Sequence, residues 1–303
     1  MKETILLAGG TGLVGSRLLE LIDYSKYKVH ILSRKKQPDT EDINYFTWDF
    51  QKMEIEKGAV DVDYIVNFTG AGIADARWTD ARKKLLIRSR VDSARLIKKG
   101  LDRSGHTPKA YISASAVGFY GDRGGEKLTE HSPVGEGFMA DCCQQWEDSA
   151  KELEALVGRL VINRIGIVLS TQGGALPKIL MTKSVGVYNY FGSGSQYYSW
   201  IHIDDLCRVF LKNITDDSMR GIYNTVAPEP LTNKDFTRTI KDSLGGIAAL
   251  PAPVFGLRLL LGEMANVVLN SNRVYPTELE KDNFHYDHSD LGPAVLDLLE
   301  RKI

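Results

Sequence analysis

The sequence predicts an α/β protein built on a parallel, doubly wound sheet with a smaller C-terminal lobe. One observation is a glycine-rich turn that links an apolar run to a helical pattern near the N-terminus. Another is the alternation of apolar, β-rich runs with amphipathic stretches through the first half of the chain. After Arg164 this rhythm loosens into glycine-rich and proline-rich segments. We therefore expect one large sheet domain and a lobe that covers it.

The glycine-rich turn is the segment 9–15 (GGTGLVG), which follows the apolar run 3–8 and precedes a helical pattern over 16–22. Glycines at this spacing allow a tight turn, a close approach of backbone N–H groups to a pyrophosphate, and close packing of helix on strand. The helix N-terminus adds partial positive charge. The unit predicts a Rossmann-type dinucleotide site, although glycines also punctuate ordinary turns.

A basic cluster ends the second predicted strand, over 28–33. Ser33 is followed by Arg34, Lys35 and Lys36. In this fold an acidic residue at the corresponding place usually holds a free ribose 2′-hydroxyl, whereas an arginine accommodates a 2′-phosphate. The cluster favours NADP(H) over NAD(H) as cofactor. The alternative is a solvated basic loop.

The remaining pattern predicts strands over 44–48, 62–68, 110–115 and 160–169, helices over 79–101 and 140–156, and a helical region over 255–269. Ligands of a doubly wound sheet gather beyond the carboxyl ends of its strands. We expect an NAD(P)-binding domain over 1–245, interleaved with lobe segments after about residue 165, and a small helical domain over 246–303.

Composition narrows the function classes. The 303 residues include 38 basic and 39 acidic side chains, a net charge of −1, which argues against a nucleic-acid or membrane partner. No export signal or membrane span is expected, and three cysteines are too few for a disulfide framework, so we predict a cytoplasmic protein. His285 and His288 form an isolated H-x-x-H, and no metal is expected.

Several motifs resemble a known superfamily. The glycine-rich turn, the Ser-Ala-Ser of 113–115, the segment 117–121 (VGFYG) and the segment 200–205 (WIHIDD) resemble the extended short-chain dehydrogenase/reductases, which include nucleotide-sugar epimerases. More narrowly, the Arg-Trp-Thr of 77–79 and the tail 251–299 resemble the atypical "epimerase family" of NADP-binding proteins with a small C-terminal domain of unknown function. The resemblance covers nearly the whole chain.

The resemblance implies a set of cofactor-binding residues. These are Gly9, Thr11, Gly12, Leu13, Val14 and Gly15 at the pyrophosphate, Ser33 and Arg34 at the 2′-phosphate, Asp49 and Phe50 at the adenine rim, and Asn67, Thr69, Gly70 and Ala71 along the ribose and nicotinamide. The alternative for Asp49 is that it simply ends a strand.

The catalytic machinery departs from the superfamily pattern. Active members use a tyrosine and a lysine four residues later, but the segment 138–143 (FMADCC) holds neither. The resemblance places Ser115 at the nicotinamide, and Tyr120, in the loop just beyond, is a candidate proton donor that needs no lysine. The alternatives are a hydroxyl bonded to its own backbone and an aromatic ring that only packs. Cys142 and Cys143 are candidate thiols, although most buried cysteines are inert.

Arg77 and Trp78 precede the long predicted helix, where a guanidinium beside an indole suits an anionic or planar substrate. Alternatively, Trp78 staples the helix start and Thr79 caps it. We expect Lys83, Arg90 and Arg95 to lie on a solvated helix face. In the segment 200–205, Asp204 or Asp205 is expected to cap a helix.

Two functions fit these features. One is an NADP(H)-dependent oxidoreductase or epimerase that acts by hydride transfer on a small hydroxyl- or carbonyl-bearing substrate, such as a nucleotide-sugar-like one. The other is a non-catalytic NADP(H)-binding redox sensor. The cofactor cleft with its covering lobe favours the first, and the missing tyrosine–lysine pair favours the second. The charge-rich long helix predicts a monomer or a weak homodimer.

Overall fold

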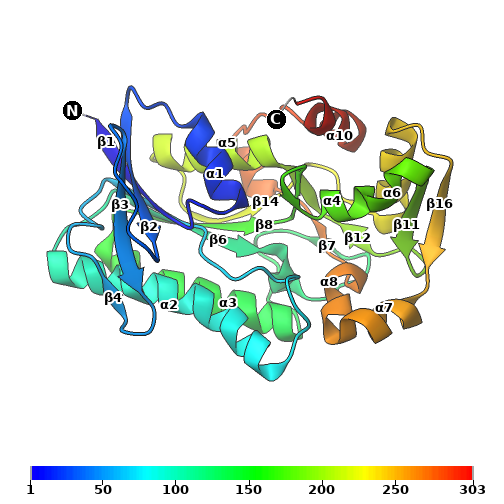
Figure 1. Ribbon diagram of the computed structural model, residues 1–303, viewed down its shortest axis with the longest axis horizontal. Helices are drawn as coiled ribbons and strands as arrows, with labels where there is room; N and C mark the ends of the chain where they lie inside the picture. The colour runs from blue at the N-terminus through cyan, green and yellow to red at the C-terminus, as the bar shows by residue number, and fades with distance from the viewer. Residues whose placement is uncertain (1, 302–303) are drawn as a thin grey trace.

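The computed structural model describes residues 2–301 and is organised around one large sheet (Figure 1). Its eight strands lie in the order β14-β8-β6-β5-β1-β2-β3-β4, and all pairs are parallel except β3 with β4. The order runs outward from β1 in both directions, so the predicted doubly wound parallel sheet is confirmed. The strands are β1 Glu3–Ala8, β2 Tyr27–Ser33, β3 Ile43–Asp49, β4 Glu54–Ile55, β5 Tyr64–Asn67, β6 Ala110–Ala116, β8 Leu160–Ile165 and β14 Gly221–Thr225.

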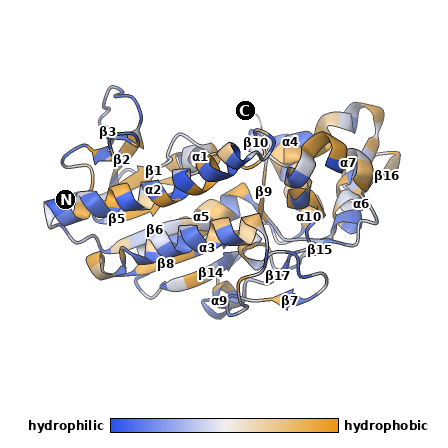
Figure 2. Cartoon of the chain, turned by 90° about the horizontal axis from the view of Figure 1, so that it is seen from below, coloured by the Kyte–Doolittle hydropathy of each residue, from blue (hydrophilic) through white to orange (hydrophobic). Residues whose placement is uncertain are grey.

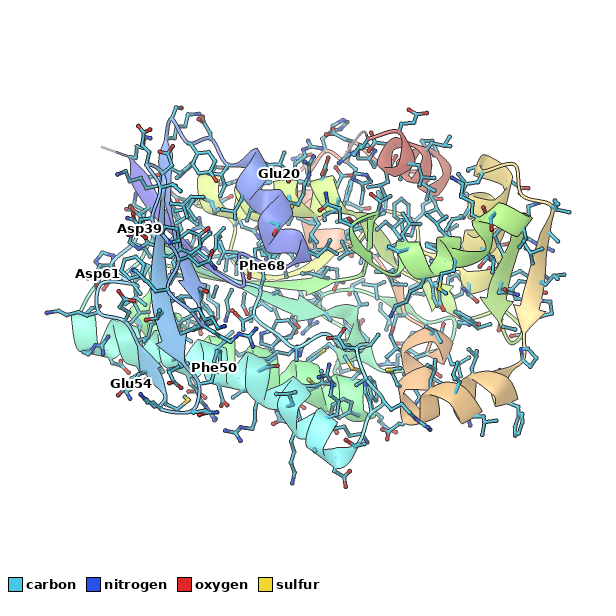
Figure 3. All side chains as sticks on the ribbon, viewed as in Figure 1. Glu20, Asp39, Phe50, Glu54, Asp61 and Phe68 are labelled. Atoms are coloured by element: carbon cyan, nitrogen blue, oxygen red, sulfur yellow. The ribbon has the colours of Figure 1, made fainter. Side chains whose placement is uncertain are left out.

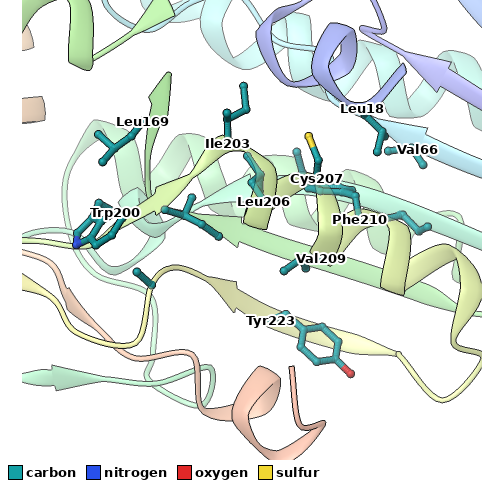
Figure 4. Packing of buried hydrophobic residues seen from close by; sticks show 14 of the residues in the cluster. Leu18, Val66, Leu169, Trp200, Ile203, Leu206, Cys207, Val209, Phe210 and Tyr223 are labelled. Carbon is teal, nitrogen blue, oxygen red and sulfur yellow. The ribbon is translucent and has the colours of Figure 1, made fainter. Parts of the chain in front are cut away.

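Two helical layers cover the sheet. Helices α1 (Leu13–Leu21) and α5 (Ile203–Thr215) lie on one face, and α2 (Asp80–Ser104) and α3 (Phe138–Lys151) lie on the other (Figure 1). Figure 4 shows the packing under α5, where apolar side chains of this amphipathic helix meet those of the strands. Because both faces are covered, the central strands are almost wholly apolar.

One expected strand is wrong in its extent. The predicted run over 160–169 breaks at Gly166, where β8 ends and β9 (Ile167–Ser170) leaves the large sheet for β10 (Gly173–Gly174) and β13 (Trp200–His202). A Cβ atom at Gly166 would lie 2.5 Å from the carbonyl oxygen of Ser199. Only glycine permits this close crossing, at which the chain exchanges one strand partner for another.

The C-terminal lobe is interleaved with earlier segments. Strand β16 (Ala248–Ala252) pairs with β11 (Val187–Phe191), β17 (Arg273–Val274) with β7 (Lys127–Leu128), and β15 (Leu231–Thr232) with β12 (Tyr197–Tyr198). The other helical elements are η1 Val117–Tyr120, η2 Glu154–Leu156, α4 Leu176–Ile179, η3 Leu180–Val185, α6 Asn233–Ser243, α7 Val254–Leu261, η4 Gly262–Ala265, α8 Asn266–Leu269, α9 Thr277–Lys281 and α10 Leu291–Glu300. The helical region expected over 255–269 is thus three short segments.

Helix α5 begins on a histidine cap, so the expectation that Asp204 or Asp205 caps it is wrong. Nδ1 of His202 accepts a hydrogen bond from the backbone N–H of Asp204 at 3.1 Å. The Asp204 carboxylate instead pairs with Arg17, 2.7 Å from its Nε, and with Arg301, 2.5 Å from its Nη2. Asp204 therefore joins α5 to α1 and to the C-terminal end of the chain.

The His202 ring is buried and stacks on His288, with 3.8 Å between ring centroids. The segment that carries His288 is held by Asp205, whose carboxylate accepts backbone N–H groups of Asp287 and His288 at 3.0 and 2.9 Å. Burial, reinforced by the charge of His288, lowers the pKa of His202 to about 4. At neutral pH the capping ring is therefore uncharged.

This lowered pKa predicts acid-sensitive stability. Because the folded pKa lies below the unfolded value near 6.5, the unfolded chain binds the extra proton, and stability that is complete above about pH 6.5 is lost as the pH falls toward 4. Between pH 7 and pH 5 we expect a loss of about 2 kcal/mol from this residue in urea unfolding. His202→Asn, which keeps a capping oxygen, should remove that part of the slope. Exposed His285→Asn is the control; equal slopes in both variants would contradict the prediction.

Candidate functional site

The turn between β1 and α1 forms an open cradle of backbone groups. Gly9 has φ +82°, a conformation that side-chain-bearing residues rarely adopt. A Cβ atom at Gly15 would lie 2.5 Å from the Gly9 oxygen and 2.6 Å from Cα of Gly10, so the helix can approach the strand only without one. No side chain caps α1 at Gly12, and its first N–H groups are left without intrahelical acceptors. Such a helix N-terminus suits an anion.

The loop after β5 lies against this cradle. A Cβ atom at Gly9 would come within 3.1–3.3 Å of Phe68 and Thr69, and Figure 3 shows Phe68 beside the start of α1. The Asn67 side chain is buried: its oxygen accepts the N–H of Thr69 at 3.0 Å, and its amide donates to Ser93 at 3.0 Å. The Thr69 hydroxyl is buried without a hydrogen-bond partner. Asn67 therefore shapes the loop, and Thr69 offers a polar atom for a ligand.

The side chains at the ends of β2 and β3 differ in whether protein groups already occupy them. Ser33 accepts a hydrogen bond from the N–H of Lys35 at 3.3 Å, while the Arg34 side chain is exposed and pairs with no acidic residue in 2–301. Asp49 accepts two backbone N–H groups from the turn that follows it, which lowers its pKa, and Phe50 packs edge-on against Trp48 at 4.7 Å. Arg34 is thus a free charge, whereas Asp49 ends its strand.

Ser115 belongs to a buried charged network. Its hydroxyl donates to Oε1 of Glu147 at 2.7 Å, and Glu147 receives Nε and Nη2 of Arg164 at 2.8 and 2.9 Å. The three residues come from β6, α3 and β8, and each is at most 2% exposed. Burial would lower the pKa of Arg164, but the hydrogen bonds and charge of Glu147 raise it above its usual value. The network fixes α3 on the sheet directly behind Ser115.

Tyr120 lies in the same network. Its hydroxyl donates to Oδ1 of Asn224 at 2.6 Å and accepts Nη1 of Arg164 at 2.9 Å. The side chain is wholly buried, and burial raises the pKa of Tyr120 to about 12. Its oxygen is therefore engaged as donor and acceptor within the protein. Sequence reasoning did not find Glu147 or Arg164 as members of this network.

Arg77 and Trp78 lie where the sheet domain meets the C-terminal lobe. Thr79 caps α2, as one alternative expected, and the Trp78 ring packs edge-on against Phe138 with centroids 4.8 Å apart. Arg77 is exposed, and its guanidinium lies beside Gly262 in η4, 3.1 Å from where a Cβ atom would be. Trp78 thus connects α2 to α3, and Arg77 remains open to solvent at the lobe.

The thiols of Cys142 and Cys143 are buried in α3, at 2% and 1% exposure. Burial raises the pKa of both. Both therefore remain protonated at neutral pH, and a protonated thiol is a poor nucleophile.

One group in the described chain could reach a single metal ion, formed by His202, Asp204 and His288. Two features oppose an ion there. The Asp204 carboxylate already binds two arginines. Nδ1 of His202 accepts a backbone N–H, which leaves the proton of the neutral ring on Nε2, the nitrogen that a ligand would have to offer.

A cavity of about 500 Å³ opens between the loop after η1 and the lobe. Its lining combines aromatic rings, hydroxyls and one arginine: Asp122, Gly124, Gly125, Phe191, Gly192, Ser193, Ser195, Gln196, Tyr197, Val254, Arg258, Leu269 and Ser271. Helix α7 forms part of one wall and is coloured largely as hydrophobic in Figure 2. Its Phe255, Leu259 and Leu260 side chains are exposed to solvent. In sequence, the first lining residue, Asp122, follows η1 by two positions.

Comparison with known proteins assigns the family. The model of the NAD dependent epimerase/dehydratase family matches residues 5–225. The chain belongs to this family. A second model, a domain of unknown function, matches residues 252–298. The resemblance inferred from the sequence is therefore confirmed. No helix within residues 2–301 is both long enough and apolar enough to cross a membrane.

Similar proteins are found across nearly the whole chain. Epimerase family proteins of Staphylococcus saprophyticus and Staphylococcus aureus are both 34% identical, covering 97% and 99% of this chain and 98% and 100% of theirs. A human epimerase family protein crystallised with NADPH has a TM-score of 0.87 and 27% identity, covering 99% of this chain and 100% of its own. A nucleoside-diphosphate sugar epimerase from Corynebacterium glutamicum has a TM-score of 0.78 and 32% identity, covering 99% of this chain and 58% of its own.

Proposed function

We propose that this protein is an NADP(H)-dependent oxidoreductase or epimerase that acts on a small hydroxyl- or carbonyl-bearing substrate. The observation that carries the proposal is the open cradle at β1–α1, where the helix N-terminus is uncapped and the loop that holds the unpartnered Thr69 hydroxyl lies against the Gly9 turn. The NADPH complex of the similar human protein supports it. The cofactor, when bound, exchanges a hydride with the substrate.

The cofactor-binding residues of the proposal divide into those that touch the cofactor and those that shape its site. The first set is Gly9, Thr11, Gly12, Leu13, Val14 and Gly15 at the pyrophosphate, Ser33 and Arg34 at the 2′-phosphate, Phe50 at the adenine rim, and Thr69, Gly70 and Ala71 at the nicotinamide side. Asn67 and Asp49 shape the site, because their side chains are engaged by protein N–H groups.

Of the two hydroxyls expected to act on substrate, Ser115 is the better candidate. It donates its only proton to Glu147, and its oxygen accepts no hydrogen bond from residues 2–301, so it is free to accept one from a substrate hydroxyl. Both hydrogen-bonding roles of the Tyr120 oxygen are taken. We assign Tyr120 a positioning role, since it holds Arg164 and through it Glu147.

The substrate proposal is nucleotide-sugar-like. The 500 Å³ cavity offers the rings of Phe191 and Tyr197 and the hydroxyls of Ser193 and Ser195, which suit a base and a sugar. Arg77 at the lobe would meet a negatively charged group. The similar nucleoside-diphosphate sugar epimerase supports this substrate class.

The cofactor assignment is tested by titrating NADPH and NADH into the wild type and Arg34→Ala. We expect the variant to bind NADPH about tenfold more weakly, because a charge-assisted contact to the 2′-phosphate is lost, while its NADH affinity stays unchanged. Lys57→Ala, at an exposed lysine outside the basic cluster, is the control and should leave both affinities unchanged. Absence of binding of either nucleotide to the wild type would reject the proposal.

A sensor is the second candidate function. The observation that favours it is that the segment 138–143 lacks a tyrosine–lysine pair while the Ser115 and Tyr120 hydroxyls are buried. Hydride transfer from bound NADPH to a panel of carbonyl compounds separates the two. The enzyme predicts turnover that Ser115→Ala lowers by about a hundredfold. Tight NADPH binding without turnover on any carbonyl would favour the sensor.

A further inference from the structure

Arg90 is a buried cation without a counter-ion. Its side chain is 6% exposed, so the expectation of a solvated face is wrong for this residue. The guanidinium donates only to backbone carbonyls, that of Leu86 at 2.9 Å and that of Ala71 at 3.2 Å. No carboxylate in residues 2–301 lies within 4.0 Å of it. Most buried arginines are paired with an acidic group, whereas the charge of this one meets only backbone carbonyls.

The Arg90 guanidinium lies at the carboxyl end of β5. Its Cζ atom is 2.8 Å from where a Cβ atom of Gly70 would be, so it lies flat against the exposed loop that holds Gly70 and Ala71. On its other side it packs over the Trp146 ring at 4.9 Å. The site is therefore the edge of the sheet at which the proposed cleft ends, beside the α3 segment that lacks the usual lysine.

No ionisable group that the structure describes around Arg90 carries a compensating negative charge. The facing groups of α3 are the Cys142 and Cys143 thiols, which burial keeps protonated. On its own helix the nearby ionisable group is Arg82, a second cation, which is itself paired with Asp75 at 3.5 Å. A buried, uncompensated charge is weakly screened, so it acts strongly on any charge that forms beside it.

We propose that Arg90 supplies, from α2, the positive charge beside the nicotinamide ring and so makes the cleft prefer the neutral, reduced ring to the cationic, oxidised one. The inference rests on the proposed function, because it requires the dinucleotide to bind in this cleft. Arg90 then acts as a specificity-determining residue for the redox state of the cofactor. It also positions the loop at Ala71, to which it donates.

The test compares dissociation constants for NADPH and NADP⁺, measured by titration at moderate salt without any substrate. The two forms carry the same phosphates, so their ratio isolates the charge of the ring. We expect the wild type to bind NADPH about tenfold more tightly than NADP⁺, and Arg90→Gln to bring the two affinities within about threefold of each other. Arg90→Lys keeps the charge and should keep most of the preference.

Arg88→Gln is the matched control, since Arg88 lies on the same helix but is solvent-exposed and pairs with Asp92. Its ratio should equal that of the wild type. A wild type that binds NADP⁺ as tightly as NADPH would overturn the inference, and this result needs no variant to fold. An unchanged ratio in folded Arg90→Gln would overturn it as well. Failure of both nucleotides to bind is a different result, which rejects the cofactor cleft itself.

Discussion

Glu147→Gln is expected to lower the free energy of unfolding by about 3–5 kcal/mol, because it leaves the Arg164 guanidinium buried without its charge partner. The pair is bidentate, and the side chains are 1% and 3% exposed. Glutamine has nearly the same shape as glutamate, so the loss reflects charge and hydrogen bonding rather than a cavity. The measurement is urea unfolding at pH 7, followed by circular dichroism.

Arg164→Met should lower the free energy of unfolding by a similar amount, because it leaves the Glu147 carboxylate buried without its charge partner. The double variant should cost clearly less than the two single losses added together, because it leaves no unpaired buried charge. Glu126→Gln serves as the control: its partner Arg123 is three residues away and the Glu126 side chain is exposed, so the change should lower the free energy of unfolding by less than about 1 kcal/mol. Strictly additive losses for Glu147 and Arg164 would show that the two side chains do not act as a pair.

The features that the sequence predicted are local ones. The turn at 9–15 and the cap at Thr79 depend on residues within a few positions of each other. The alternation of strand and helix likewise follows from nearby periodicity. The break at Gly166 does not, because it depends on the backbone of Ser199, which the chain brings back only after the lobe segment. A glycine inside an apolar run signals such a crossing without naming its partner.

The buried charged residues also could not be paired from the sequence, although the burial of one of them could be predicted. Glu147 and Arg164 lie on α3 and β8, and no spacing within either element shows that they face each other. Arg90 was predictable in part. It lies at helical spacing on the stripe formed by the buried residues of α2, which include Leu86, Ala94, Ile97 and Leu101. The spacing therefore indicates that the Arg90 side chain points toward the sheet. A cation at a position of the apolar stripe indicates an inward-facing side chain.

Gly15→Ala is expected to abolish cofactor binding, with NADPH affinity falling by about a hundredfold or more, and to destabilise the fold by about 2 kcal/mol. The added Cβ would lie 2.5 Å from the Gly9 oxygen and 2.6 Å from Cα of Gly10. Both are backbone atoms of the turn itself, so the clash is relieved only by opening the cradle that the proposal assigns to the pyrophosphate. NADPH titration and urea unfolding measure the two effects.

Gly256→Ala separates this steric effect from the general effect of alanine in a helix. Gly256 lies in α7 with nothing within 4 Å of a Cβ atom, so alanine there should leave NADPH affinity unchanged and stabilise the fold by up to about 1 kcal/mol. Gly15 is also helical, and alanine would stabilise it equally if space allowed. Normal NADPH binding by folded Gly15→Ala would mean that the nucleotide does not depend on the close approach of α1 to β1, and the pyrophosphate would have to be assigned elsewhere.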